Sequence, residues 1–120
     1  MKIEKLMQQV KEKEPLVQCI TNFVTVNDCA NILLSIGATP TMAMDCREVE
    51  EAVAKVSALV CNMGAIEHLE SMLLAGKEAN RLHIPVVLDP VGAGGYNFET
   101  RGCKPVDSGG SICSNPWKCF

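Results

Sequence analysis

Several common signals are missing from this 120-residue sequence. No apolar stretch approaches the roughly 18 residues of a membrane-spanning helix, and the charged segment at the N-terminus is not a signal peptide. The formal net charge is −3, whereas nucleic-acid binders usually present a basic face. We therefore expect a cytoplasmic protein that engages neither a membrane nor a nucleic acid.

The sequence also lacks a CxxC pair, although it holds seven cysteines. Zinc sites prefer short ligand spacings, and the shortest spacing here runs from Cys113 to Cys119. Cys19, Cys29 and Cys61 lie in apolar segments, where a reduced cysteine behaves as a small hydrophobe. The cysteines predict a reduced protein without a zinc site.

What the sequence does contain is a regular alternation of amphipathic and apolar segments, and 48% of its residues are hydrophobic. Helical spacing predicts helices over residues 2–13, 25–36, 45–56 and 66–82. Short apolar runs predict strands over residues 16–20, 41–44, 58–62 and 84–89. This alternation predicts one α/β domain with a mainly parallel sheet and flanking helices. Ligands bind such sheets at the carboxyl ends of the strands.

The last of these strand ends carries the loop "DPVGAGG" at residues 89–95. Asp89 ends a buried strand, and glycines such as Gly92 and Gly94 let backbone N–H groups approach an anion. The loop is neither a Walker motif nor a G-x-G-x-x-G ahead of a helix. Two interpretations stay open, a phosphate-facing loop and a tight turn that needs glycine for its shape.

Two other strand ends offer candidate ligand-binding side chains. Asn22 is either a cap at the entry of the second helix or an amide that lines a pocket. Met42 and Met44 are either core residues or a ligand-facing pair, since alternation along a strand would place both on one face. Asn62 and His68 have no partner at an informative spacing, and we expect His68 at a helix surface.

Three stretches of the sequence resemble the opening part of the hydroxyethylthiazole kinases, a family of thiamine-salvage enzymes. They are "PLVQCITNFVTVNDCANILLSIGATPTMA" at residues 15–43, "ALVCNMGAI" at 58–66 and "IPVVLDPVGAGG" at 84–95. The likeness runs in order, without large gaps, from about residue 3 to residue 95.

This resemblance implies a ribokinase-like fold and an enzyme that phosphorylates the hydroxyl of 4-methyl-5-(2-hydroxyethyl)thiazole with ATP and Mg²⁺. It implies that Met42 and Asn22 bind the thiazole and that Asp89 is the metal ligand. Gly92 and Gly94 would lie on the phosphate and nucleotide side. The family forms homotrimers that bind the thiazole between neighbouring subunits.

The sequence departs from the family in its last part. We expect residues 1–95 to be the N-terminal part of a truncated kinase domain and residues 96–120 to be an unmatched, loop-rich tail, because the tail shows neither helical nor strand periodicity. The family's late Gly-Thr/Ser-Gly-Cys motif has no counterpart, and Ala65 replaces a usual threonine.

No catalytic residue is assigned in this sequence, because the family's late cysteine motif is absent. We therefore expect little or no phosphorylation by this chain alone. The alternatives are a non-catalytic α/β module that binds thiazole or phosphate, and a fragment without function.

Overall fold

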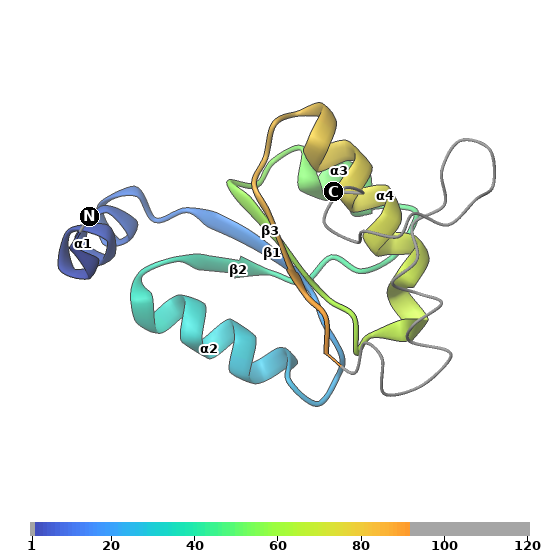
Figure 1. The fold of residues 1–120 in the computed structure, drawn as a ribbon, viewed down its shortest axis with the longest axis horizontal. Coiled ribbons are helices and arrows are strands. Elements are labelled where there is room, and N and C mark those ends of the chain that lie inside the picture. Colours follow the sequence, from blue (N-terminus) through green and yellow to red (C-terminus); the bar gives the residue numbers. More distant parts are fainter. Residues whose placement is uncertain (1, 92–120) are drawn as a thin grey trace.

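The computed structural model describes residues 2–91, which form a four-stranded parallel sheet with helices on both faces (Figure 1). This architecture confirms the predicted α/β class with a parallel sheet. The glycines Gly92 and Gly94 and the expected tail at residues 96–120 lie outside the described residues.

Helices and strands alternate along the chain as the sequence predicts. The helices are α1 (Ile3–Lys13), α2 (Val26–Ile36), α3 (Val49–Val53) and α4 (Leu69–Arg81), and a 3₁₀ turn, η1 (Ile66–His68), precedes α4. The strands are β1 (Leu16–Ile20), β2 (Thr39–Thr41), β3 (Ala58–Asn62) and β4 (Val86–Asp89).

The strand order in the sheet is β2-β1-β3-β4, and every neighbouring pair is parallel. The chain runs from β1 outward to β2 and then passes back over β1 to reach β3 on its other side. The direction of winding therefore reverses between β1 and β3. Such a switch point opens a crevice at the carboxyl ends of the two strands.

Alternate side chains of the central strands enter two separate cores. Val17 and Cys19 of β1 pack with Ala38 on the side of the sheet that α2 covers. Ile20 of β1 and Leu59 of β3 belong to the core under α3 and α4, on the opposite side (Figure 1). The strict alternation follows from the pleat of a strand whose two faces are both covered.

The second strand lies earlier than the prediction of residues 41–44. It ends at Thr41, and the carbonyls of Ala43 and Met44 accept hydrogen bonds from side chains rather than from a neighbouring strand. Strand alternation does not apply after Thr41, so the prediction that Met42 and Met44 share a face is wrong. Met42 packs on the α2 side, whereas Met44 packs against the core under α3 and α4.

Two helices also differ from the prediction in extent. Asp45 accepts a hydrogen bond from the backbone N–H of Arg47. The side chain of Glu48, the N-cap residue of α3, makes no capping hydrogen bond. The helix that follows is the short α3, and Val56 is buried beyond its end. The helix expected over residues 66–82 is divided into η1 and α4 at His68.

Candidate active site at the carboxyl edge of the sheet

Asn22 lies two residues after the end of β1 and organises the turn that leads into α2. Its Oδ1 accepts hydrogen bonds from the backbone N–H groups of Val24 and Thr25 and from the Thr25 hydroxyl, each at 3.1 Å. Asn22 is therefore a helix-entry residue, which was one of its two predicted roles. The amide nitrogen Nδ2 lies on the β3 side, since a Cβ built on Gly64 would stand 3.2 Å from it. The same side chain thus shapes the turn with Oδ1 and directs Nδ2 towards Gly64, just after β3.

Asn62, the last residue of β3, connects two neighbouring strand ends. Its Oδ1 accepts a hydrogen bond of 2.8 Å from the backbone N–H of Gly64, and its Nδ2 donates to Asp89 Oδ2 over 3.4 Å. The register of β3 and β4 sets Asn62 directly beside Asp89. The sequence reasoning missed this partner, because it lies 27 residues away along the chain.

Asp89 brings an exposed carboxylate to this edge. As far as residues 2–91 show, one of its oxygens receives the long bond from Asn62 and the other acceptor positions of the carboxylate are free. Mg²⁺ usually binds through one or two carboxylates together with the phosphates of the substrate. The donor set therefore fits a magnesium ion held jointly with a nucleotide. Within residues 2–91 no group of three His, Cys, Asp or Glu side chains could hold a metal by itself.

Met42 follows β2 at the same edge of the sheet. Its side chain is half-buried and packs against the core residues Val17, Cys19 and Ala38. The structure thus brings Asn22, Asn62 and Asp89 around the switch point, and it places Met42 one strand further out, beyond β1.

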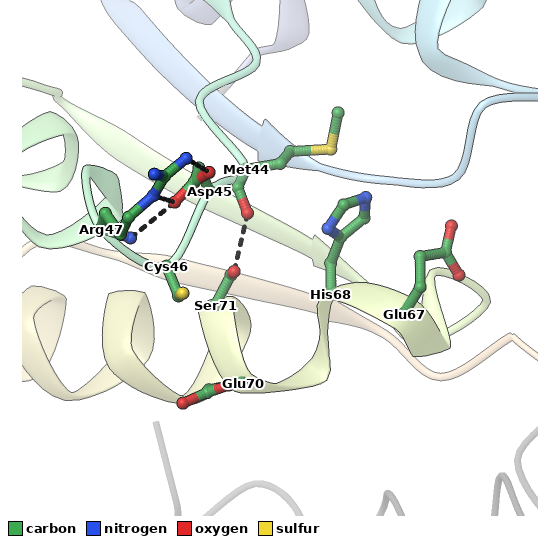
Figure 2. Close-up of a pocket in the computed structure, with 8 residues that line it drawn as sticks. All are labelled: Met44, Asp45, Cys46, Arg47, Glu67, His68, Glu70 and Ser71. Atoms are coloured by element: carbon green, nitrogen blue, oxygen red, sulfur yellow. Dashed lines mark hydrogen bonds and ion pairs between the residues drawn. The ribbon is translucent and has the colours of Figure 1, made fainter.

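A pocket of about 400 Å³ lies between the loop after β2 and the start of α4 (Figure 2). Its volume falls within the range of small-molecule sites. The lining residues are Met44, Asp45, Cys46, Arg47, Glu67, His68, Glu70 and Ser71.

Figure 2 shows the Ser71 hydroxyl directed at the Met44 carbonyl and Arg47 held by Asp45. The Arg47 guanidinium and its backbone N–H hold the pKa of the Asp45 carboxyl well below its usual range. His68 is half-buried at this pocket, so the prediction of a helix-surface position describes it incompletely.

The buried cysteines near the site are not reactive thiolates. Burial raises the pKa of the Cys61 thiol to about 12, and the neighbouring Cys19 adds to the rise. Burial, with a smaller contribution from Cys29, raises the pKa of Cys19 to about 11. Both cysteines are therefore protonated at neutral pH, and a thiol is a poor nucleophile compared with its thiolate. They pack in the core as small apolar side chains, as the sequence predicts.

Comparison with known proteins identifies relatives of most of the described region. The family model of the hydroxyethylthiazole kinase family matches residues 7–110, which reaches beyond residue 95, where we expected the likeness to end. A hydroxyethylthiazole kinase of Alkaliphilus oremlandii is 56% identical over 103 residues, which are 84% of this chain and 38% of that protein. One of Clostridium tetani is 56% identical over 101 residues, covering 82% of this chain and 37% of that protein.

A solved structure supports the same relationship. The hydroxyethylthiazole kinase protein of Pyrococcus horikoshii OT3 superimposes with a TM-score of 0.78 at 45% sequence identity. The match covers 82% of this chain and 39% of that one, so the chain spans about two fifths of the length of its relatives. The superposition confirms the ribokinase-like fold that the resemblance implied. Separately, none of the helices in residues 2–91 is long and apolar enough to cross a membrane.

Proposed function

This chain belongs to the hydroxyethylthiazole kinase family, and from that membership we propose that its sheet edge forms the substrate end of a kinase site. The reaction is ATP-dependent phosphorylation of the hydroxyl of 4-methyl-5-(2-hydroxyethyl)thiazole, in thiamine biosynthesis or salvage. The observation that carries the proposal is that Asn22 and Asn62 lie close together where the winding of the sheet reverses, with Asp89 bonded to Asn62 from the next strand. Ligands of open α/β sheets bind at that point.

The residues divide into an apolar and a polar part. Met42 supplies a flexible, polarisable contact for the flat thiazole ring, and Asn22 Nδ2 supplies a hydrogen-bond donor. Asn62 does not need to touch the substrate, because it joins the Gly64 loop to Asp89. The site would thus hold a neutral ring at one end and a charged group at the other.

Asp89 would hold Mg²⁺, which neutralises the negative charge on the phosphates of ATP when it is bound. Without a cation the carboxylate repels phosphate, so Asp89 discriminates against free anions. Gly92 and Gly94 follow directly in the chain and are proposed to face the phosphates with their N–H groups. Phosphoryl transfer depends chiefly on such positioning and charge neutralisation.

We also propose that the protein works as a homotrimer in the cytoplasm. Phe23, Val24, Ile32 and Leu34 are large apolar side chains that are 58% to 84% exposed around α2. An apolar surface of this kind is typical of an interface. The four cysteines of the described region are free, which agrees with a reducing compartment.

Calorimetry with the thiazole alcohol and the full chain tests the proposed site. Asn22→Ala removes the donor, and Asp89→Asn removes the carboxylate. A lost hydrogen bond of about 1–2 kcal/mol corresponds to a roughly tenfold weaker thiazole affinity for Asn22→Ala. Asp89→Asn should leave thiazole affinity within about twofold, because the ring is neutral and the carboxylate is proposed to serve the metal.

The matched control is Asn80→Ala, an exposed asparagine near the C-terminal end of α4, far from the strand ends. It should leave thiazole binding unchanged. Equal losses of affinity in Asn22→Ala and Asn80→Ala, or no binding by the unsubstituted chain, would remove the support for this function.

A further inference from the structure

The loop between β2 and α3, residues 42–48, carries Met42 and is held by two side chains from other elements. Gln18 of β1 donates from Nε2 to the carbonyl of Ala43 over 2.7 Å. Ser71 of α4 donates from its hydroxyl to the carbonyl of Met44, also over 2.7 Å (Figure 2). Both side chains are buried, with 0% and 4% of their surface exposed. Both bonds are partly buried, so they are shielded in part from water, which strengthens a hydrogen bond.

Gln18 holds the backbone on both sides of Met42. In the register of β1 and β2 it pairs with Thr41, the residue before Met42. Its side chain bonds to Ala43, the residue after Met42. Met42 itself packs on the opposite side of the sheet. Gln18 therefore contacts the backbone on each side of the proposed thiazole-binding methionine.

Folding stability alone does not explain a glutamine at this place. Among residues 2–91 its buried Oε1 finds no hydrogen-bond partner, and an unpaired buried oxygen is unfavourable. If the Gln18 amide were flipped, Oε1 would face the Ala43 carbonyl, and two acceptor oxygens repel each other. The hydrogen bond to Ala43 therefore determines the orientation of the amide. A methionine of similar length would fill the space without the unpaired oxygen, but it could not hold Ala43.

We propose that Gln18 and Ser71 are positioning residues that set Met42 for thiazole binding, an inference that rests on the proposed function. They act through the backbone of the loop and do not touch the substrate. Loss of either bond should let residues 42–48 move and should weaken thiazole binding. A hydrogen-bond loss of this kind corresponds to a roughly threefold to tenfold rise in Kd.

The test uses the full chain with the substitutions Gln18→Met and Ser71→Ala. The matched controls are Gln8→Met on the exposed face of α1 and Ser35→Ala on α2, whose hydroxyl also donates to a backbone carbonyl over 2.7 Å. Calorimetry gives the Kd of the thiazole alcohol. Amide hydrogen exchange without ligand gives the mobility of residues 42–48, and urea unfolding gives the global stability.

Both test variants should raise Kd and accelerate exchange in residues 42–48, while the controls change neither. Ser71→Thr keeps a hydroxyl, so its thiazole Kd and its exchange rate in residues 42–48 should stay close to those of the unsubstituted chain. A loss of global stability with unchanged loop exchange and Kd would overturn the proposal, because the bonds would then be merely structural. If the unsubstituted chain binds no thiazole, the proposed function fails. In that case hydrogen exchange of residues 42–48 still tests whether Gln18 and Ser71 hold the loop. If Gln18→Met and Ser71→Ala leave this exchange unchanged, the inference is overturned as well.

Discussion

Gly64 shows how a single missing side chain shapes the site. An ideal Cβ at this position would lie 2.9 Å from Asn62 Oδ1 and 3.2 Å from Asn22 Nδ2. Asn62 cannot readily move aside, because the same oxygen accepts the bond from the Gly64 N–H. The glycine therefore permits two amides from neighbouring strand ends to stand close together.

Gly64→Ala should weaken thiazole binding about tenfold by displacing these amides. The clash costs about 1–3 kcal/mol, and the lower entropy of the unfolded chain offsets about 0.4–1 kcal/mol of it. We expect the free energy of unfolding to fall by only about 1 kcal/mol. Calorimetry and urea unfolding measure the two effects, and full thiazole affinity in this variant would contradict the placement of the two amides.

Among the elements, α2 depends on its C-terminal glycine. Gly37 has a φ of 93°, and the N–H groups of Gly37 and Ala38 bond to the carbonyls of Leu34 and Leu33 at 3.1 and 2.9 Å. This arrangement ends the helix and turns the chain into β2. A Cβ on Gly37 would stand 2.8 Å from Lys11 Cγ, so the same position also sets how closely α1 approaches.

Gly37→Ala should lower the free energy of unfolding by about 1–2 kcal/mol, since a left-handed residue with a Cβ is strained. The clash with Lys11 adds to that loss. Thiazole affinity should change by less than about twofold, because Gly37 lies at the amino ends of the strands. Urea unfolding and calorimetry check both parts. Gly64→Ala should mainly weaken thiazole binding and Gly37→Ala should mainly lower stability, so each variant is a control for the other. A loss of thiazole binding without a loss of stability in Gly37→Ala would contradict this prediction.

At the scale of the whole molecule, the described sheet ends in two edge strands, β2 and β4. Val87 of β4 is 59% exposed. Edge strands offer unpaired N–H and C=O groups to another chain. The chain also spans only 38% of the length of its relative from Alkaliphilus oremlandii. The late Gly-Thr/Ser-Gly-Cys motif that the family resemblance implies has no counterpart in the sequence.

A polypeptide of these 120 residues should therefore bind the thiazole alcohol more tightly than Mg·ATP and should not turn over. Asp89 alone should hold Mg²⁺ only weakly, whereas the neutral ring should need only apolar contacts and one hydrogen bond. Loss of a single charge-stabilising donor already costs roughly 10²–10³ in rate. Calorimetry with each ligand and a coupled ATPase assay test this. Tight Mg·ATP binding without thiazole binding, or turnover near the usual kinase rates of about 1–100 s⁻¹, would disprove it.

The sequence alone determined the order of elements and the parallel sheet, and it predicts the edge at which ligands bind. Apolar runs such as residues 58–62 and helix stops such as Gly37 are local signals, and local signals are readable without a structure. Asn22 was open to two roles because only one of them depends on local sequence. Its turn is visible in the sequence, but what faces its Nδ2 is not.

Only the tertiary structure decided which distant residues meet. Asn62 reaches Asp89 through strand register, and Gln18 reaches Ala43 across 25 residues. After β2 ends at Thr41, the carbonyls of Ala43 and Met44 accept bonds from Gln18 and Ser71, and Met42 and Met44 enter different cores. Backbone groups bond to whichever partner the packed fold brings within reach, and neither strand periodicity nor residue spacing carries that information.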